Sequence, residues 1–549
     1  MRKKWEFYET NEEKVKEIAE IHNINKLLAT ILVNRGIVED NQVEVFLKPT
    51  RENFHNPLQM PDMEIARDRV IQAIDNKEKV IIYGDYDVDG ITSTTVLKSF
   101  LEDRGLFVDS YIPNRLDEGY GLNNEALDRI SAEGYTLMIT VDCGISAVHE
   151  IEYANTLGIE TIITDHHEPG EVLPNAIAIV DAKRKDNQYT CRDLAGVGVV
   201  FKLIQAIGQK LNLDEKEYLK YLDIVCVGTI SDIVPLVDEN RVITKLGLML
   251  VEQTKNLGLK SLLMASGYKK IDSTTISFGV APRINASGRM GHQEDALKLF
   301  LSKNIEEVRE LTQTLNNYNS TRQDIEKKIY EEAINKIEKE NLAKENVIVV
   351  AGNEWHHGVI GIVASKITEK YFKPTILLSF DGDIGKGSGR SVPGFDLHNA
   401  LSNCSNTLEK FGGHAMAVGV TVEKSRLQEF KDSLEKIAVE NKTQDIVPII
   451  NIDTEVTLNE VDRECVESLK MLEPFGEGNK MPLFAIRNLK IDSIRALSEG
   501  RHLKLTLRDN NIIINAIGFN MGHLADEYII GDKIDVVGVL EINTFGRNG

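Results

Sequence analysis

Three aspartates, Asp85, Asp87 and Asp89, alternate along the segment GDYDVDG, which directly follows the apolar run VIIY. Carboxylates at this spacing repel one another, and each raises the pKa of the others unless a positive charge lies between them. The segment is therefore either a solvated turn or a place where several carboxylates share a cation.

Three further segments end in groups that bind metals. Asp142 follows ITV, the triplet Asp165, His166 and His167 follows IIT, and Asp232 follows the apolar stretch IVCVGTIS. In a parallel sheet the carboxyl ends of the strands lie side by side, so we expect these groups to converge. Carboxylates with one or two imidazoles suit Mn²⁺ or Mg²⁺, whereas Zn²⁺ more typically draws thiolates or several histidines. A carboxylate shared by two such ions, about 3.5 to 4 Å apart, belongs to the arrangement that activates water for phosphoryl transfer.

Taken singly, each of these groups has a simpler explanation. An aspartate at a strand end is most often a turn residue or a helix N-cap, and a His-His pair usually lies at the surface or in the core. Cys143, beside Asp142, is a candidate nucleophile, but no general base accompanies it in the sequence. Four such segments within one α/β pattern favour a shared metal site over these alternatives.

The elements that must position these groups alternate between strand and helix. Expected strands at 80–84, 107–113, 135–142 and 159–165 begin about every 25 residues and are separated by amphipathic helical segments. This spacing is typical of βαβ units, and it predicts a doubly wound α/β domain over residues 65–240.

The second half of the chain shows three different patterns. Residues 300–345 are highly charged, contain no Pro or Gly, and carry apolar residues in an approximate helical stripe, which predicts a long connecting helix. A second α/β pattern with Gly-rich segments covers residues 346–445. From residue 446 to 549, polar and apolar residues alternate at short intervals. That alternation predicts a small β domain of the OB type, which is incomplete if the natural chain continues.

Composition limits the classes of function. With 42% hydrophobic and 27% charged residues, the 549-residue chain is typical of soluble globular proteins. Its net charge of −21 argues against passive coating of nucleic acid, although it allows an enzyme with a local basic groove or with metal ions that meet phosphates. We expect no membrane segment and no signal peptide, because no apolar run is long enough. Five scattered cysteines favour a reducing, cytoplasmic location.

Several segments resemble the motifs of one enzyme family. GDYDVDG, VDCG, TDHH and GTISDIVPL resemble the four motifs of the DHH phosphoesterase superfamily. PNRLDEGYGL, LAGVGVVFKL, RINASGRMG, GKGSGRS and FGGHAMAVG are similar to segments of its RecJ branch, the single-strand-specific 5′ to 3′ exodeoxyribonucleases. Tyr83 stands where other branches often have a histidine, as expected for the RecJ branch. The resemblance covers almost the whole chain and depends on the motifs jointly.

The resemblance implies a catalytic centre with two metal ions, Mn²⁺ or Mg²⁺. The implied metal ligands are Asp87, Asp89, Asp142, His166 and Asp232. Asp142 would bridge the ions, with Asp87 at one ion and the other three ligands at the second. Asp85 is implied either as a ligand or as a support for the ligands. His167 would donate to a non-bridging oxygen of the scissile phosphate, and the nucleophile would be water rather than a side chain.

The resemblance also implies residues that contact DNA. Ser388 and Arg390 in GKGSGRS would hold the 5′-terminal phosphate, where glycines allow a close backbone approach. The other implied contacts are Asn114, Arg115, Arg283, Arg289, Gly412, Gly413 and His414. Each has an ordinary alternative, namely a Gly-rich hairpin, close packing against small residues, or a surface ion pair.

The C-terminal β domain carries a local excess of basic residues. They are Arg487, Lys490, Arg495, Arg501, Lys504 and Arg508. They could follow a single-stranded backbone, with Phe484 or His502 stacking on bases. A solvated barrel face is the alternative.

The function implied is a two-metal exodeoxyribonuclease that is specific for single strands, releases 5′-mononucleotides from the 5′ end, and acts in DNA repair and recombination. A narrow channel between the two lobes would exclude duplex DNA. Expected partners are a single-strand-binding protein and a RecQ-type helicase, and we expect a monomer. The alternatives are a phosphodiesterase of short oligonucleotides or cyclic dinucleotides, which the extra domains disfavour, and a non-catalytic DNA-binding scaffold, which the intact motifs disfavour.

The predicted fold is therefore two α/β lobes, of the DHH and DHHA1 types, joined by a long helix and followed by an OB-like β domain. The predicted segments are an N-terminal helical segment (1–50), a catalytic domain (51–299), a connecting helix (300–345), a substrate-binding domain (346–445) and a nucleic-acid-binding β domain (446–549).

Overall fold

The computed structural model describes residues 3–114, 118–119 and 121–543, which form two units. The larger unit comprises Phe54–Val447, and the smaller one combines Met1–Asn53 with Pro448–Gly549. None of the described helices is long and apolar enough to span a membrane.

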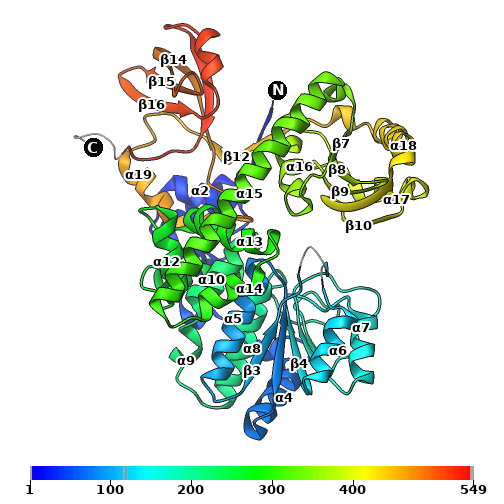
Figure 1. The fold of residues 1–549 in the computed structure, drawn as a ribbon. Helices are drawn as coiled ribbons and strands as arrows, with labels where there is room; N and C mark the ends of the chain where they lie inside the picture. The colour runs from blue at the N-terminus through cyan, green and yellow to red at the C-terminus, as the bar shows by residue number, and fades with distance from the viewer. Residues whose placement is uncertain (1–2, 115–117, 120, 544–549) are drawn as a thin grey trace. The chain divides into compact units, whose positions relative to one another are not determined.

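A five-stranded parallel sheet forms the centre of the first lobe of the larger unit (Figure 1). Its strand order is β3-β2-β4-β5-β6, with bounds β2 Val80–Gly84, β3 Val108–Tyr111, β4 Leu137–Val141, β5 Glu160–Thr164 and β6 Ala178–Val180. All residues of β2 and β4 are buried, as expected for strands that are covered on both faces. The strand order reverses between β2 and β4, and such a switch point leaves a crevice at the carboxyl ends of the strands.

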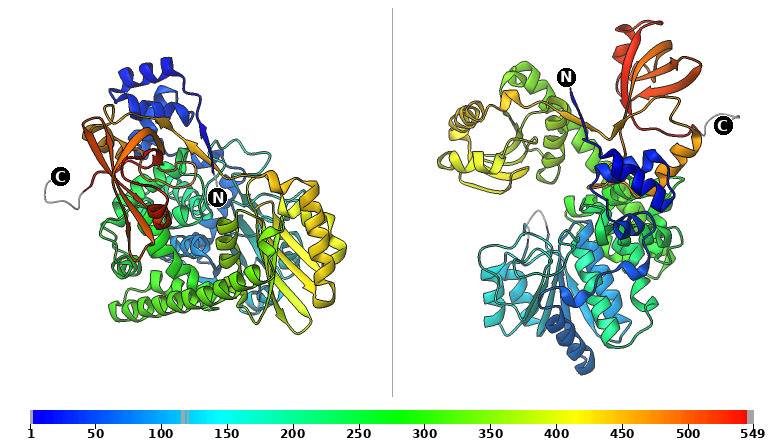
Figure 2. Two further views of the ribbon diagram at one scale, coloured as in Figure 1. Left: turned by 90° about the horizontal axis from the view of Figure 1, so that it is seen from above. Right: turned by 180° about the vertical axis from the view of Figure 1, so that it is seen from behind.

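Helices cover both faces of this sheet (Figures 1 and 2). One face carries α4 Met63–Asn76, α5 Val88–Glu102 and α8 Gly196–Lys210, and the other carries α6 Asn124–Ala132 and α7 Val148–Thr156. Alternate residues of β2 enter the two layers, with Val80 and Ile82 in one hydrophobic core and Ile81 and Tyr83 in the other. The predicted doubly wound arrangement is confirmed.

Beyond α8 the first lobe is helical. Its elements are α9 Lys216–Leu219, α10 Leu222–Ser231, α11 Asp238–Val251, α12 Leu257–Ser266, the π-helical turn η3 Thr275–Val280, α13 Ala281–Arg289 and α14 Gln293–Leu301. The expectation that Asp232 closes a segment of the sheet is wrong, because Asp232 is the C-cap of helix α10. Helix α10 is buried around its whole circumference except at Ser231, and a uniformly apolar segment has no periodicity that separates a buried helix from a buried strand.

The second lobe follows the 35-residue helix α15, Ile305–Lys339. Its sheet has the order β10-β11-β9-β8-β7, with only the β7–β8 pair parallel. The strands are β7 Ile348–Asn353, β8 Thr375–Asp381, β9 Ile384–Arg390, β10 Lys410–His414 and β11 Ala417–Glu423. The helices are α16 His357–Tyr371, α17 Leu397–Asn403 and α18 Leu427–Glu440. Apolar residues of α15, α16 and β7 share one core, so α15 packs against this lobe as well as leading into it.

The smaller unit joins the two ends of the chain. Strand β1, Lys4–Phe7, pairs in parallel with β12, Ile449–Ile452. The N-terminal helices are α1 Glu12–His22, α2 Lys26–Asn34 and α3 Asp40–Leu47, and the C-terminal part contains β13 Thr454–Glu455, α19 Arg463–Ser468, β14 Phe484–Leu497, β15 His502–Asp509, β16 Ile512–Gly518 and β17 Lys533–Gly538. Residues of both ends form a single hydrophobic core, which includes Leu28 and Ile31 of α2 and Leu489 and Leu507 of the C-terminal sheet.

Candidate metal and substrate sites

A tight turn between β2 and α5 carries the first group of carboxylates. Asp87 caps α5, and its Oδ1 accepts hydrogen bonds from the backbone N–H of Asp89 at 2.8 Å and of Gly90 at 3.1 Å. A Cβ atom at Gly90 would lie 2.3 Å from the carbonyl oxygen of Asp85. This close approach explains why glycine stands here in the sequence and how three aspartates fit within one turn.

The N-terminus of α8 lies against the same turn and against Asp142. Both carboxylate oxygens of Asp89 accept from backbone N–H groups of α8, from Gly196 at 2.6 Å and from Val197 at 2.8 Å. Asp142 follows β4 with a φ of 60° and is buried. A Cβ atom at Gly196 would lie 2.8 Å from Asp142 Oδ1. Gly196 lies within the segment LAGVGVV, but no role at the metal site was predicted for it from the sequence.

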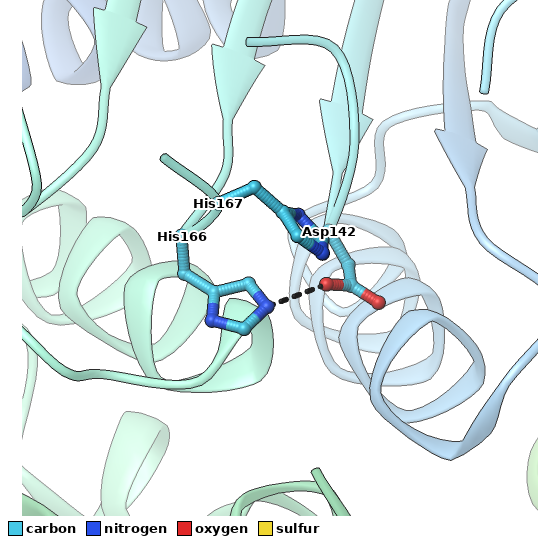
Figure 3. A group of neighbouring side chains, drawn as sticks. All are labelled: Asp142, His166 and His167. Carbon is cyan, nitrogen blue, oxygen red and sulfur yellow. Dashed lines mark ion pairs between the residues drawn. The ribbon is translucent and has the colours of Figure 1, made fainter. Parts of the chain in front are cut away.

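Histidines that follow β5 face Asp142 (Figure 3). His166 Nε2 lies 3.1 Å from Asp142 Oδ1, 3.6 Å from Asp232 Oδ2 and 3.9 Å from Asp89 Oδ2. The structure therefore brings the aspartates that follow β2, β4 and α10 to one imidazole.

His167 is oriented by Asp165. Its Nδ1 lies 2.7 Å from Asp165 Oδ1, and Asp165 Oδ2 accepts from the backbone N–H of Ile145 at 2.9 Å. Asp165 was expected at this edge of the sheet, but its role in orienting His167 was not predicted. Its position directly before the two histidines was the available signal.

The assembled side chains fit a pair of divalent cations. Three groups have ligand atoms that all lie within 4.8 Å of one another: Asp85, Asp87 and Asp142; Asp89, His166 and Asp232; and Asp142, His166 and His167. Asp142 Oδ1 and His166 Nε2 are buried and make no hydrogen bond within the described part of the chain. Carboxylate oxygens together with an imidazole, at buried positions whose ligand atoms are left to contact one another, suit Mn²⁺ or Mg²⁺.

Burial and mutual repulsion set the protonation of these groups. Burial, followed by the neighbouring carboxylates, raises the pKa of Asp89 to about 7, that of Asp232 to about 9, and that of Asp142 well above its ordinary value. Burial lowers the pKa of His166 to about 3, with the charge of His167 adding to the effect. The metal-free site therefore retains protons that bound cations would displace.

His167 has the opposite shift. Burial lowers its pKa, but the hydrogen bond and charge of Asp165, together with Asp232 and Asp89, outweigh this effect and raise the pKa to about 9. His167 is thus protonated at neutral pH and able to donate. Cys143 is fully buried and its thiol pKa is raised by desolvation, so the site offers no thiolate nucleophile.

A cavity of about 390 Å³ adjoins the residues expected to hold the strand end. It is lined by Arg289, His357, Gly358, Gly361, Ile362, Ser365, Lys366, Glu369, Ser388 and Arg390. Arg390 Nη1 donates to Ser388 Oγ at 3.0 Å, and Arg289 Nη1 donates to the carbonyl of Gly358 at 2.8 Å. A Cβ atom at Gly361 would lie 3.0 Å from Ser388 Oγ, so this glycine keeps the cavity open.

The register of the second sheet aligns the other predicted contacts with Ser388 and Arg390. Across β9, β11 and β10, Ser388 pairs with Gly419 and Gly419 with Gly412. In the adjacent row, Arg390 pairs with Ala417 and Ala417 with His414. Gly412, Gly413 and His414 are exposed. Ser388, Arg390, Gly412 and His414 therefore lie on one face of the second sheet. Only two small residues of β11, Ala417 and Gly419, lie between the two pairs.

The remaining residues predicted to contact DNA, Asn114, Arg115 and Arg283, are not among the described lining residues of this cavity. The Arg283 guanidinium donates to Asn316 Oδ1 at 2.6 Å, to the carbonyl of Ala265 at 3.1 Å and to the carbonyl of Gly279, and so links helices of the first lobe to α15. Asn114 lines a separate cavity of about 620 Å³ with residues of α14. Arg115 lies outside the described residues.

In the C-terminal sheet, one proposed stacking residue is unavailable. Phe484 is 1% exposed and belongs to the core, because its position on β14 faces inward. His502 contacts Phe519, which is 71% exposed and which the sequence analysis missed, with ring centroids 5.4 Å apart. Arg487 pairs with Glu455 and Asp535, and Arg508 with Asp492.

Comparisons with known proteins agree with this architecture. The model of the DHH family N-terminal domain matches residues 79–229, that of the DHHA1 domain matches 344–440, and that of the RecJ OB domain matches 452–549. These matches confirm the predicted fold class of two α/β lobes and an OB-like domain.

Similar proteins share both sequence and structure with nearly the whole chain. The single-stranded-DNA-specific exonuclease RecJ of Bacillus subtilis is 39% identical over 99% of this chain and 69% of its own length. That of Salmonella typhimurium is 32% identical over 95% of this chain and 94% of its own length. The crystal structure of Thermus thermophilus RecJ in complex with Mn²⁺ has a TM-score of 0.85 at 28% identity, and covers 99% of this chain and 77% of that chain. The chain therefore belongs to the RecJ family of single-stranded-DNA-specific exonucleases.

Proposed function

We propose that this protein hydrolyses single-stranded DNA from the 5′ end, releases 5′-mononucleotides, and uses two Mn²⁺ or Mg²⁺ ions. The observation that supports the proposal most strongly is the convergence of Asp89, Asp142, His166 and Asp232 at the switch point of the parallel sheet. Within the described residues, Asp142 Oδ1 and His166 Nε2 are buried there without a hydrogen bond. Relatives named single-stranded-DNA-specific exonuclease RecJ, and RecJ structures that contain Mn²⁺ or Mg²⁺, point the same way.

We propose that Asp142 is the shared ligand. It belongs to two of the three ligand groups, one with Asp85 and Asp87 and one with the two histidines. Asp87, Asp89, His166 and Asp232 would complete the two sites, and Asp85 would act as a ligand or hold the turn. When bound, the cations would supply Lewis-acid chemistry that activates water and neutralises charge on the phosphate.

The residues of the chain prepare this chemistry. The α8 N-terminus holds both oxygens of Asp89, so this carboxylate cannot rotate away from the site. Asp165 orients the protonated His167 ring, which would donate its Nε2–H to a non-bridging phosphate oxygen as negative charge develops there. No side chain at the site acts as a nucleophile in this scheme.

We propose that Ser388 and Arg390 hold the terminal phosphate. A guanidinium and a hydroxyl that already contact each other at the wall of a cavity are suited to a phosphate monoester. Arg289 would contribute a further charge, and the Gly412–His414 segment would adjoin the strand. A pocket that accepts one strand end gives the reaction its direction.

The roles of the segments are part of this proposal. Residues 51–299 would perform catalysis, 300–345 would connect the lobes, 346–445 would bind substrate, and 446–549 would bind nucleic acid with residues 1–50 attached. Exposed Phe519 and the neighbouring basic residues of β14 and β15 support the last role. We further propose a monomer in the cytoplasm that acts in DNA repair and recombination with a single-strand-binding protein and a RecQ-type helicase. The five unpaired cysteines support the location.

The test uses single strands labelled at the 5′ or 3′ end, alone or annealed to a complement, with Mn²⁺ and then with EDTA. We expect immediate release of a mononucleotide from the 5′ label, progressive shortening of the 3′-labelled strand, and little attack on blunt duplex. Hydrolysis of dinucleotides but not of long strands would instead indicate a small-substrate phosphodiesterase, and binding without hydrolysis would indicate a scaffold.

The variant Asp142→Ala tests the assigned centre. Loss of the shared ligand should abolish nearly all hydrolysis while the protein remains folded. Asp128→Asn, which changes a surface carboxylate that accepts from Tyr153, is the matched control and should retain activity. Metal-dependent hydrolysis by Asp142→Ala would refute the ligand assignment.

A further inference from the structure

A third cation lines the cavity that contains Ser388 and Arg390. Lys366 of α16 is among the lining residues, and α13 contributes Arg289. Among the described lining residues, one carboxylate, Glu369, opposes these three cations. The described part of the lining therefore carries a net positive charge, which suits an anion.

Lys366 is held at the cavity wall by the connecting helix. Its Nζ forms an ion pair with Oε1 of Glu326 on α15, whose side chain is only 5% exposed. Oε2 of the same carboxylate accepts from Arg322, one turn earlier on α15. Arg322 is fixed in turn, because it also donates to Asn319 Oδ1 at 2.6 Å.

Two cations thus share one buried carboxylate, which leaves a surplus positive charge. Arg322 alone balances Glu326, so Lys366 can leave its partner without stranding an unpaired charge in the interior. The Lys366 side chain is 55% exposed, and its ammonium group lies at the end of a flexible four-carbon stem. Lys366 can therefore turn toward an anion in the cavity while Arg322 and Glu326 remain paired.

We propose that Lys366 is a specificity-determining residue for a terminal phosphate in this cavity, and that its ion pair with Glu326, which Arg322 also neutralises, holds it near the cavity until the phosphate takes the place of Glu326. The inference rests on the proposed function, in which Ser388 and Arg390 receive the 5′-phosphate. It assigns α15 a part in recognising the strand end in addition to connecting the two lobes.

The test compares short single strands that end in a 5′-phosphate or a 5′-hydroxyl. Dissociation constants are measured by fluorescence anisotropy in EDTA, where hydrolysis does not occur, and KM values are measured with Mn²⁺. We expect Lys366→Gln to reduce the preference for the phosphorylated strand about tenfold, because one charge-assisted contact to a phosphate is worth about that factor. Lys366→Arg should keep most of the preference.

Two further variants separate recognition from a structural effect. Lys370→Gln, one turn later on α16 and outside the cavity lining, should keep the wild-type preference. Glu326→Gln releases Lys366 and should increase the preference for the phosphorylated strand. If Glu326 served only folding, the substitution would instead weaken the binding of both strands to the same extent. Thermal denaturation establishes that each variant is folded.

A Lys366→Gln protein with the wild-type preference would overturn the inference. A wild-type protein that digests single strands from the 5′ end without any preference for phosphate would instead refute the proposed pocket of Ser388 and Arg390. Absence of digestion by the wild type would refute the proposed function itself. The three failures are therefore distinguishable.

Discussion

Asp89, Asp142 and Asp232 lie together at a buried site, and this placement is unfavourable for ionised carboxylates without a compensating charge. Their raised pKa values follow from burial and mutual repulsion. Repulsion between these carboxylates destabilises the folded protein unless protons or cations bind to them. The stability of the protein therefore depends on both pH and metal binding.

The first residue-scale prediction concerns the stability of the metal-free protein. Asp89, with a pKa of about 7, and Asp232 and His167, with pKa values of about 9, hold protons in the folded state that the unfolded chain releases at lower pH. Stability should fall as pH rises from 6.5 to 9. Below pH 6.5 the lowered pKa of His166 acts in the opposite direction, which limits the window.

Thermal denaturation in EDTA across this pH range checks the prediction. Added Mn²⁺ should raise the melting temperature and flatten the pH dependence, because cations replace the protons. A metal-free protein with constant stability over the window, or one that Mn²⁺ does not stabilise, would contradict the account.

The second residue-scale prediction concerns His167, which Asp165 orients and keeps protonated. His167→Ala should reduce the rate of hydrolysis by about 10² to 10³, as loss of one donor to a developing oxyanion does. The rise in melting temperature with Mn²⁺ should remain, because Asp89, Asp142, His166 and Asp232 would still be available to hold the cations. His149→Ala, at an exposed position on α7, is the control. Loss of the Mn²⁺ effect would make His167 a ligand instead.

At the scale of elements, the ends of strands and helices bring the site together. Strands β2, β4 and β5 deliver the aspartates and histidines, α10 delivers Asp232, and the N-terminus of α8 closes over Asp89 and Asp142. Backbone N–H groups at a helix N-terminus are well placed to hold a carboxylate. The close approach of α8 to the site requires glycine at its first position.

The element-scale prediction compares two glycines of α8. Gly196→Ala places a Cβ 2.8 Å from Asp142 Oδ1 and should displace either the helix end or the carboxylate, with a loss of activity of at least about tenfold in keeping with the sensitivity of catalysis to positioning. A Cβ atom at Gly198 would lie 3.4 Å from the Leu194 side chain, an ordinary contact, so Gly198→Ala should be active. Its free energy of unfolding should rise by up to about 1 kcal/mol, because alanine has the higher helix propensity. Steady-state kinetics and thermal denaturation measure both effects. Equal activities would show that the contact with α8 is not needed.

At the scale of the whole molecule, the smaller unit depends on both ends of the chain. Arg35, at the C-cap of α2, pairs with Asp453, and both side chains are nearly buried. Arg35 also donates to the carbonyl of Lys480 at 2.6 Å and to Asn479 Oδ1. The N-terminal helices are thus a structural part of the β domain that lies more than 400 residues later in the sequence.

The prediction at this scale is that Arg35→Ala destabilises the smaller unit by about 3 to 5 kcal/mol, since it leaves Asp453 buried without its partner. Hydrogen exchange of β14 and β15 should accelerate, while exchange of β2 and β4 in the larger unit stays unchanged. Lys26→Ala removes a surface ion pair with Glu12 in the same helices and should cost about 1 kcal/mol at most. Unchanged protection of β14 in Arg35→Ala would contradict a shared core.

The sequence by itself determined the local elements and the kind of chemistry. Periods of two and 3.6 residues, and turns such as that at Gly90, arise from contacts within a few residues, so they are visible in the sequence. The types and spacing of Asp85, Asp87, Asp89 and Asp142 indicated a cation site for the same reason. Motif resemblance then supplied the family and its expected substrate.

Only the tertiary structure decided which distant residues meet. Asp232 lies at the end of a buried helix rather than a strand, and Phe484 faces a core. Glu326 of α15 forms an ion pair with Lys366 of α16. The pairing of α2 with the C-terminal sheet is of the same kind. Such contacts depend on how whole helices and sheets pack, and this packing is driven by the burial of apolar area over the entire chain. Contacts of this kind leave no short-range pattern in the sequence, so they could not be predicted from it.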